Sequence, residues 1–590
     1  MTGIYGKTAL ILLALAVTLA PFVLPSFQLF VLSLALVYTI AILGVNIVMG
    51  YAGQVSLGHA GFAAIGAYTT ALLMTEWDIH YLVALMAGAL LAAASGYLLA
   101  FPALKLGPVY VAMVTFGFGL VIFLIAQNWY ELTNGPNGIV VPPPTLFGYP
   151  LLAEDFHIVI ALFLIVFYWL ARNLIRSSYG RAFVAIRDGQ LAAEAMGVNL
   201  ARYKTMAFSI GAFYAGLSGG LFAGLSQFVN PDAFVFINSI FYVTMGILGG
   251  MGYLAGAGIG GAMMALLPEL LRGAAEYKDF LTGLMLLLLL IFLPRGAMGL
   301  IDQTWIQPIA RARPPFREAL PARNEGGTRR AANSEVLLES KRLTKHFGGL
   351  RAVQDVSFQI RRGEILSLIG PNGAGKTTVF NLISGIHAPT AGKIFFEGRD
   401  ITQDPPHARA ALGIGRTFQN LELFGEMAVS ENVLVGAHSR THTNLFTAFV
   451  HTPAQQNEEA ELEKKALTLL ANVGLERNAS ERAESLSFGH QRLLEIARAL
   501  ASEPRLLLLD EPAAGLNSKE TDALAETIHR ARDELGIAIL LIGHTMRLVM
   551  SLSDRIVVLD QGQKIADGVP AAIRADTRVI EAYLGATVDA

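Results

Sequence analysis

The stretch GPNGAGKTT, at residues 370–378, decides the fold of the half of the chain that contains it. An apolar run at 364–369 precedes it and a helical-looking run at 379–386 follows it, which predicts a strand, a glycine-rich turn and a helix. In such a turn the backbone N–H groups point inward at an anion, and the helix adds its positive end. Lys376 can reach the β- and γ-phosphates, and the Thr377 hydroxyl can ligate Mg²⁺. The sequence therefore predicts a site for a nucleoside triphosphate.

The composition divides the 590 residues into two unlike halves. The chain is 53% hydrophobic and 15% charged, which is too apolar for an average soluble protein. Residues 1–300 are long apolar stretches with few charges, whereas residues 335–590 look like a soluble α/β domain. The net charge of −2 gives no basic field, so we expect no nucleic-acid partner. The absence of cysteine from the sequence excludes disulfides, thiolate catalysis and cysteine-bound metals.

Residues 1–300 contain about ten apolar segments near the length that spans a bilayer. They fall near 7–24, 28–49, 55–74, 81–102, 108–127, 157–175, 204–227, 234–250, 254–271 and 278–294. The first segment begins at Lys7 and runs into Pro21 without a convincing cleavage site. We therefore expect a retained membrane anchor there, not a signal peptide.

Charge placement predicts how these segments are oriented. The linkers 75–80 and 128–156 carry acidic residues and no Lys or Arg. With an even number of spans, one face carries Lys7, Lys105, Arg295 and the basic cluster within 172–204. Arg272 and Lys278 are the exceptions, in a short outer loop. The sequence thus predicts a multi-pass protein of the cytoplasmic (inner) membrane, with both termini in the cytoplasm.

Several polar residues lie inside the predicted spans. Asn46, Gln54, Ser56 and His59 lie in VNIVMGYAGQVSLGHAGF, and Glu269 lies near the end of the ninth span. Such residues can line a substrate path. They can also join helices by hydrogen bonds, which is the commoner use of polar side chains in membrane bundles.

Three further stretches outside the nucleotide half carry structural signals. The small residues of GILGGMGYLAGAGIGG, at 246–261, predict close helix packing, and a broken helix lining a cavity is the alternative. Residues 177–204 are too polar to span, and 182–196 is predicted as one short helix that ends at Gly197. The Arg- and Pro-rich segment 301–334 predicts a flexible cytoplasmic linker whose arginines lie on anionic lipid headgroups.

Carboxylate, histidine and glutamine side chains at or near predicted strand ends are candidate metal-binding and catalytic groups beside the phosphate loop. LLLLDEP, at 506–512, predicts a buried parallel strand that ends in two carboxylates. Asp510 can hold Mg²⁺ through water, and Glu511 can polarise the attacking water. His544 ends another strand, in IAILLIGHT, where it can contact the γ-phosphate. Gln419, in RTFQN, can bridge the metal or the attacking water to a contact with the membrane half.

Two other stretches favour further nucleotide contacts. LSFGHQRLLEIARAL, at 486–500, is a glycine turn that opens a helix and so presents a second N-terminus to an anion. VLLESKRLTKHF, at 336–347, opens as a strand, and Phe347 can stack on an adenine ring or be an ordinary strand aromatic.

These motifs, in this order, resemble an ABC-transporter ATPase: GPNGAGKTT, Gln419, LSFGHQR, LLLLDEP and His544. LTKHFGGLRAVQDVSF, IGRTFQN and EPAAGLN are similar to the ATPase of branched-chain amino acid importers. In the first half, GYAGQVSLGHAGF, RAFVAIRDGQLAAEAMGVNLARYK and ILGGMG are similar to the permease of the same family. The resemblance implies a multidomain fusion: an all-α polytopic membrane domain at 1–300, the linker at 301–334, and an α/β P-loop ABC-type nucleotide-binding domain at 335–590.

The resemblance also implies the cofactors ATP and Mg²⁺ and a set of site residues. The implied nucleotide contacts are Phe347, Asn372, Gly373, Gly375, Lys376, Thr377, Thr378, Ser487 and Gly489. The implied metal contacts are Thr377, Gln419 and Asp510, and the implied catalytic residues are Glu511, His544 and Gln419.

In this family the phosphate loop of one subunit faces the signature, here LSFGHQR, of a second subunit. The resemblance therefore implies a second ATPase, a second permease and an extracytoplasmic substrate-binding protein. It also implies that the helix predicted at 182–196 acts as a lever pressed onto the ATPase domain.

The implied activity is ATP-driven import of branched-chain, hydrophobic amino acids. Two departures put the rate of ATP hydrolysis in doubt. His490 stands where the family signature usually has Gln, and Gly543 and Thr545 flank His544 where Glu and Asp are usual.

One other function fits the sequence as well as this one, and two fit it less well. Import of urea, amides or other amino acids stays open, because substrate choice belongs largely to the binding protein. A homodimeric half-transporter that exports lipid or drug usually has about six long helices, so ten short-looped spans disfavour it. Intact Glu511 and His544 disfavour an ATP-gated channel or regulator.

Overall fold

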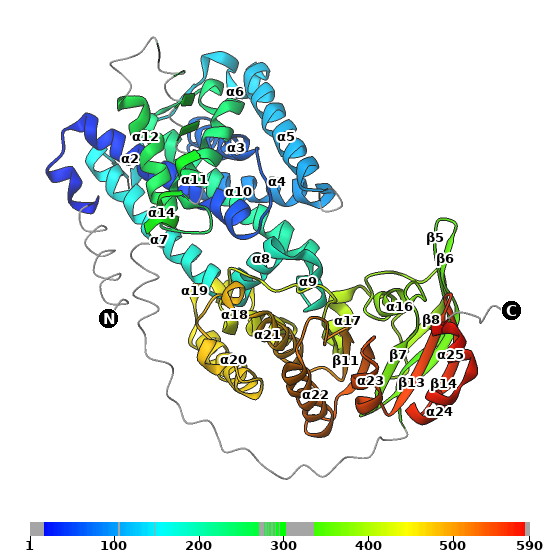
Figure 1. Ribbon diagram of the computed structural model, residues 1–590. Coiled ribbons are helices and arrows are strands. Elements are labelled where there is room, and N and C mark those ends of the chain that lie inside the picture. Colours follow the sequence, from blue (N-terminus) through cyan, green and yellow to red (C-terminus); the bar gives the residue numbers. More distant parts are fainter. Residues whose placement is uncertain are drawn as a thin grey trace. The chain divides into compact units, whose positions relative to one another are not determined.

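The computed structural model describes residues 17–103, 107–146, 148–270, 296–301 and 335–584, with single residues between 277 and 293. The chain divides into two compact units, which are taken separately below (Figure 1). Unit 1 comprises Met1–Arg187, Ala201–Pro314 and Leu445–His451, and unit 2 comprises Asp188–Leu200, Pro315–Asn444 and Thr452–Ala590. Two short segments, 188–200 and 445–451, thus cluster away from their neighbours in sequence.

Unit 1 is built from apolar helices. Those that match predicted spans are α2 (Ser26–Val45) with η2 (Asn46–Tyr51), α3 (His59–Thr75), α4 (Tyr81–Ala103), α5 (Pro108–Asn128), α7 (Ala153–Arg176), α10 (Leu200–Ser226), α11 (Phe236–Gly250) and α12 (Gly256–Leu270). The first predicted span lies mostly outside the described residues, and about half of the tenth lies outside them. Of the described helices, five are long and apolar enough to cross a membrane, and α11 and α12 are shorter apolar helices.

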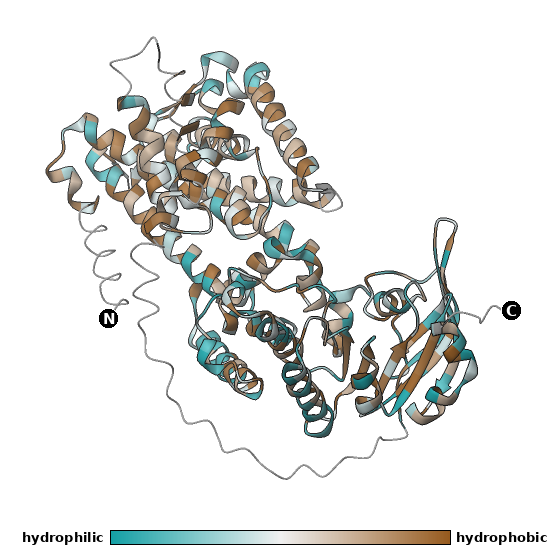
Figure 2. Cartoon of the chain, in the orientation of Figure 1, coloured by the Kyte–Doolittle hydropathy of each residue, from teal (hydrophilic) through white to brown (hydrophobic). Residues whose placement is uncertain are grey.

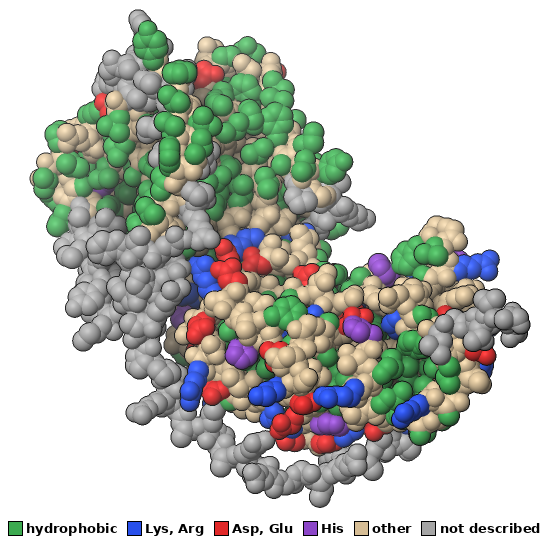
Figure 3. Space-filling view, in the orientation of Figure 1, with side chains coloured by type: hydrophobic (Ala, Val, Ile, Leu, Met, Phe, Trp, Pro, Cys, Tyr) green, Lys and Arg blue, Asp and Glu red, His purple; other side chains and the backbone are tan. Residues whose placement is uncertain are grey.

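The outer surface of these helices is itself apolar. Leu98 and Phe101 of α4 and Val109 of α5 are each about 70% exposed. Hydrophobic residues are frequent along the helices of unit 1 in Figure 2, and hydrophobic side chains cover much of its visible surface in Figure 3. Helices that are hydrophobic on all sides are buried in a protein core or in lipid. Since these faces have no protein core to cover them among the described residues of unit 1, we infer that they face lipid.

The polar stretch within the second and third spans breaks the helical run. α2 passes into η2, a π-helical turn, and the chain then runs without regular structure to the start of α3 at His59. Asn46 holds this break in place: its side-chain amide donates to the Tyr253 carbonyl at 2.7 Å and accepts from the Gly252 N–H at 2.8 Å. The hydrogen-bonding interpretation of Asn46 is therefore confirmed.

The small-residue run at 246–261 forms two helices and the turn between them. α11 ends at Gly250 and α12 begins at Gly256. A Cβ on Gly249 would lie 2.1 Å from the Gly256 carbonyl oxygen, and one on Gly260 would lie 2.4 Å from that of Met245. Close packing is thus confirmed, and the helical run is also interrupted, because the chain reverses between the two helices.

The predicted single helix at 182–196 is wrong, since the structure has two. α8 (Ser178–Asp188) ends before Gly189, whose backbone is extended, and α9 (Gln190–Ala195) follows. A glycine has no side chain to favour a helix, so the break falls where the sequence is weakest. The predicted stop at Gly197 is confirmed by its left-handed backbone, with φ of +93°.

Unit 2 contains two sheets. The six-stranded sheet has the order β10 (Ile414–Arg416), β11 (Leu506–Asp510), β12 (Ala538–Ile542), β7 (Ile365–Ile369), β13 (Arg555–Asp560) and β14 (Gln563–Gly568). Its first five strands are parallel and β14 is antiparallel. The four-stranded antiparallel sheet has the order β6 (Leu350–Arg361), β5 (Val336–Phe347), β8 (Ala391–Phe396) and β9 (Arg399–Asp400).

The core of unit 2 follows from these sheets. Every residue of β7, β11 and β12 is buried, as expected for parallel strands covered on both faces. One face packs with α16 (Lys376–Ile383) and the four-stranded sheet. The other packs with α21 (Phe488–Leu500) and α22 (Ser518–Asp533). α18 (Val429–Gly436) and α20 (Pro453–Asn472) form a further cluster with α21.

Candidate nucleotide-binding site

The phosphate loop has the predicted order of strand, turn and helix. β7 ends at Ile369, and α16 begins at Lys376. Gly370 and Gly375 have φ of +151° and +94°, which other residues rarely adopt. A Cβ would also lie 2.1 Å from the Leu559 carbonyl oxygen at Gly370 and 2.4 Å from that of Ala352 at Gly375. Both positions therefore require glycine.

Lys376 lies folded over this loop. Its Nζ donates to the carbonyl oxygens of Gly370 at 2.8 Å and Pro371 at 2.9 Å. Burial lowers the pKa of Lys376, and the nearby carboxylates of Glu511 and Asp510 oppose that shift. The two hydrogen bonds thus hold the ammonium group at the loop, where a bound phosphate would replace the carbonyl oxygens as its partner. Asn372, Gly373 and Thr377 are exposed in and beside the loop.

Sequence reasoning missed one support of the loop. The Gly370 N–H donates to the Tyr583 hydroxyl at 2.9 Å, from α25 (Thr577–Leu584). Tyr583 lies more than 200 positions from the loop in an amphipathic helix, so no local signal marks it.

Asp510, the last residue of β11, is a buried carboxylate whose oxygens are not hydrogen-bonded. It is 1% exposed, and neither oxygen has a hydrogen-bond partner among the described residues. Burial raises the pKa of Asp510 to about 6, although Arg416, 3.7 Å away, opposes the shift. Buried polar atoms without protein partners often mark the binding site of an ion or a water molecule. Oxygen, including that of a carboxylate, is also the ligand atom that Mg²⁺ prefers, so Asp510 fits a magnesium site.

Glu511, Gln419 and His544 come together from three loops. Gln419 follows β10, Glu511 follows β11 and His544 follows β12, so all three lie beyond the carboxyl ends of adjacent parallel strands. Glu511 Oε2 lies 3.4 Å from Gln419 Nε2 and 3.2 Å from His544 Nδ1. Glu511 also has φ of +48°, an unfavourable backbone conformation for a non-glycine residue. Such strain, at a carboxylate between two polar groups, is typical of a functional position.

The loop that carries Gln419 is held by α21. Arg492 donates to the Phe418 carbonyl at 2.8 Å, and Glu495 accepts from the Phe418 N–H at 2.9 Å. The two side chains also pair with each other at 3.1 Å and are almost fully buried. Sequence reasoning missed both residues, although charges at i and i+3 on the apolar side of a helix were a readable signal.

Comparison with known proteins identifies both units. The model for the permease component of the branched-chain amino acid transport system matches residues 27–290. The ABC transporter model matches residues 353–514, and the branched-chain amino acid ATP-binding cassette transporter model matches 563–589.

Individual relatives give the same result. The high-affinity branched-chain amino acid transport ATP-binding protein BraF of Pseudomonas aeruginosa is 48% identical over 252 residues, which cover 43% of this chain and 99% of BraF. The permease protein LivM of Escherichia coli is 35% identical over 319 residues, which cover 50% of this chain and 75% of LivM. The chain belongs to the branched-chain amino acid ABC transporter family. It joins the permease and ATP-binding components of that family in one polypeptide, and the ATP-binding cassette implies ATP hydrolysis coupled to transport.

Some predicted site residues of this ABC transporter chain do not join the Glu511 cluster. Ser487 is exposed and caps α21, where its hydroxyl accepts from the His490 N–H at 3.4 Å. Gly489 is buried, and a Cβ there would lie 2.4 Å from Glu520 Oε1. Among the described residues, the hydrogen bond of the Ser487 side chain is to its own helix and not to the phosphate loop. The substitution at His490 leaves the cap intact, because the cap uses only its backbone.

Phe347 also lies apart from the cluster. It ends β5, is 42% exposed and meets His387 edge to face with 5.3 Å between ring centroids. Its role in adenine stacking stays a prediction. Of the other departures, Gly543 lies close to Val549: a Cβ there would be 3.0 Å from Val549 Cγ2, so a larger residue needs Val549 to shift.

Proposed function

We propose that the chain is the fused permease and ATPase subunit of an importer of branched-chain amino acids in the cytoplasmic membrane. In this proposal, residues 1–300 form the permease, 301–334 the linker and 335–590 the ATPase domain, which lies in the cytoplasm. The observation that carries it is the Gln419–Glu511–His544 cluster in the same chain as a transport-family permease. The names of the relatives BraF and LivM supply the substrate class.

ATP and Mg²⁺ are the proposed cofactors. Asp510, with the Thr377 hydroxyl and the Gln419 side chain, would hold the metal, which neutralises phosphate charge when bound. Lys376 and the N–H groups of 370–378 would hold the phosphates. Glu511 would orient the attacking water, because its carboxylate lies between Gln419 and His544. His544 would keep Glu511 in place and contact the γ-phosphate.

The proposed assembly contains a second ATPase and a second permease, together with an extracytoplasmic binding protein. The support is the exposed position of Ser487, which takes no part in the contacts of Glu511 with Gln419 and His544 and would be available to another subunit's nucleotide. A composite site would make ATP binding close the two ATPases, and hydrolysis at Glu511 reopen them.

The segment 188–200 is the proposed lever of transport. Within unit 2, α9 packs against α17 (Pro406–Leu412). His407 lies 3.5 Å from the Glu194 carboxylate and 3.1 Å from the Asn199 side-chain amide. α17 leads directly into β10 and so to Gln419. A shift at the Gln419 loop therefore has a short path to the segment that continues into the permease.

The test is ATP-driven uptake of labelled leucine into vesicles that contain this chain, its partner subunits and the binding protein. The matched control is Glu511→Gln, which keeps the shape of the side chain and removes its charge. We expect uptake in the wild type only. ATP hydrolysis without leucine uptake would overturn the substrate assignment, and uptake of urea, an amide or another amino acid would replace it.

A further inference from the structure

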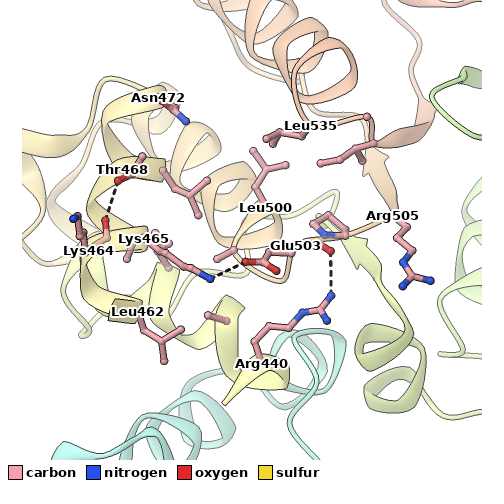
Figure 4. Close-up of a pocket in the computed structure, with 18 of the residues that line it drawn as sticks. Arg440, Leu462, Lys464, Lys465, Thr468, Asn472, Leu500, Glu503, Arg505 and Leu535 are labelled. Atoms are coloured by element: carbon pink, nitrogen blue, oxygen red, sulfur yellow. Dashed lines mark hydrogen bonds and ion pairs between the residues drawn. The ribbon is translucent and has the colours of Figure 1, made fainter. Parts of the chain in front are cut away.

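Unit 2 contains a cavity away from the phosphate loop. A cavity of about 840 Å³ lies between α20, the C-terminal end of α21 and the segment that leads into β12 (Figure 4). None of the phosphate-loop residues, Asp510, Glu511 or His544 lines it. Small-molecule pockets are typically about 300–1,000 Å³. The size therefore suits a small organic molecule, whereas a stable protein partner needs about 800 Å² of surface on each side.

The floor of this cavity is apolar and belongs to the folded core. Leu462 and Leu469 come from α20, Leu500 from α21 and Ile537 from the segment before β12. Leu535, in the same segment, also lines the cavity but is 59% exposed. Figure 4 shows Leu500 and Leu535 at the same space from two different elements. Leu462, Leu500 and Ile537 are each less than 10% exposed, so the floor is fixed by packing on either side. Such a floor suits a hydrocarbon body, because burying apolar surface is favourable.

The rim is basic. The lining contains five Lys and Arg residues against two Glu, an excess of three positive charges: Arg362, Arg440, Lys464, Lys465 and Arg505 against Glu461 and Glu503. Arg362 and Arg505 both pair with Glu397, which is not part of the lining.

The uncompensated charge gathers beside α20. Arg440 donates only to carbonyl oxygens, those of Ser502 at 2.9 Å and Glu503 at 3.1 Å. Among the described residues, no carboxylate pairs with Arg440 or with Lys464. Lys465 lies 3.1 Å from the Glu503 carboxylate, but both side chains are at least 60% exposed, so the pair is weak and readily exchanged. Arg440, Lys464 and Lys465 outnumber the two lining carboxylates, Glu461 and Glu503, by one charge, so this mouth favours an anionic group over a cationic one.

We propose that this cavity binds an amphipathic organic anion, with a hydrocarbon chain on the leucine floor and an acid group at Lys464, Lys465 and Arg440. The arrangement separates the two halves of such a molecule, because the apolar floor lies inside and the cations lie at the mouth. The site is independent of the transported substrate and of the ATP site.

Decanoate is the probe that tests this site. The full chain, in lipid nanodiscs, is irradiated with a decanoate analogue that carries a diazirine in its chain, and the labelled peptides are identified by mass spectrometry. We expect labelling within α20 and the C-terminal end of α21. Decanoate should compete at a concentration at least tenfold lower than decanol or decylammonium. Equal competition by all three would overturn the proposal, since lipid partition alone would then explain the labelling.

Two variants check the charge and the floor separately. Lys464→Glu combined with Lys465→Glu changes exposed side chains, and we expect at least a fivefold loss of labelling in α20. Lys519→Glu, an exposed cation of α22 outside the cavity, is the matched control and should leave labelling unchanged. Leu469→Trp fills the floor and should also block labelling, with the thermal unfolding midpoint confirming that the variant folds. Unchanged labelling in both cavity variants would contradict the site.

Discussion

Asn46 in unit 1 and Asp510 in unit 2 are both 1% exposed, yet their side chains differ in hydrogen bonding. Both ends of the Asn46 amide are hydrogen-bonded, to the backbone at Gly252 and Tyr253. Neither oxygen of Asp510 has a hydrogen-bond partner among the described residues. A satisfied buried group stabilises a fold, whereas an unsatisfied one destabilises it unless something else binds there. The difference separates a structural polar residue from a ligand-binding one.

In unit 1, Ser56 and His59 resemble Asp510 more than they resemble Asn46. Ser56 and His59 are at most 1% exposed, and neither the Ser56 hydroxyl nor the His59 ring nitrogens have a partner among the described residues. Both lie in the polar stretch where the chain runs from η2 into α3. By the same reasoning, the membrane unit has its own candidate position for a polar ligand.

The largest effect, on the rate of ATP hydrolysis, is expected at the Glu511 cluster. Glu511→Gln should lower ATP hydrolysis by at least about 100-fold, because a positioned carboxylate contributes about 10² to 10⁴ in rate. ATP binding should persist, since Lys376 and the phosphate loop are unchanged. Phosphate release and nucleotide binding are measured on the same preparation. Full hydrolysis in this variant would remove Glu511 from the chemistry.

Removing the cation beside Asp510 should destabilise unit 2 most. Arg416 is 4% exposed and donates to Asn381 at 2.8 Å and Ser384 at 2.6 Å, besides its 3.7 Å approach to Asp510. Arg416→Met leaves a buried carboxylate unpaired, at a cost of about 3–5 kcal/mol. The thermal midpoint, measured without Mg²⁺, should fall strongly. Adding Asp510→Asn to this variant should restore part of the loss, and no restoration would show that the two residues are not coupled.

The pKa of Asp510 gives a smaller effect with a defined sign. Burial raises that pKa from its ordinary 3.8 to about 6, so the group is mostly protonated below about pH 6. The stability that protonation gives the metal-free protein is full below pH 3.8 and is lost as pH rises through 6. Mg²⁺ requires the ionised form, so magnesium-dependent hydrolysis should fall about tenfold for each pH unit below 6. Higher Mg²⁺ should move this acid limb to lower pH, and a limb indifferent to Mg²⁺ would contradict the assignment.

The structural role of Asn46 predicts a change in stability, not in substrate affinity. Asn46→Ala removes two hydrogen bonds and takes from the Gly252 N–H the side-chain acceptor that it has here, at a cost of about 1–3 kcal/mol. The thermal midpoint should fall, while the KM for leucine stays within about twofold. A large rise in KM with unchanged stability would place Asn46 on the substrate path.

His59 tests the same comparison with a buried polar residue that has no hydrogen bond among the described residues. Its substitution has the smallest expected effect on stability. His59→Gln removes no hydrogen bond among the described residues, so the thermal midpoint should fall less than in Asn46→Ala. If the unpaired ring serves a ligand, leucine uptake should drop several-fold. Wild-type uptake in this variant would make His59 a packing residue.

Much of the molecule was readable from local sequence. The apolar lengths in residues 1–300 placed eight helices to within a few residues, five of them long and apolar enough to cross a membrane, because hydrophobic run length is the main signal for such helices. The phosphate loop was readable because glycines at fixed spacing permit one backbone path. The strand that ends at Asp510 was readable because four consecutive leucines fit only a strand buried on both faces.

The tertiary structure alone decided which distant side chains meet. The assignment of α9 to unit 2, after the break at Gly189, accompanies its packing against α17, a contact that local propensity does not encode. Tyr583 reaches Gly370 across the sheet, and Arg492 with Glu495 holds the Gln419 loop from another helix. These contacts join residues up to 213 positions apart, and residue type alone does not encode a partner at such a separation. The sequence determined the elements and their chemistry, whereas only the packed fold decided which polar groups are satisfied and which stay free for a ligand.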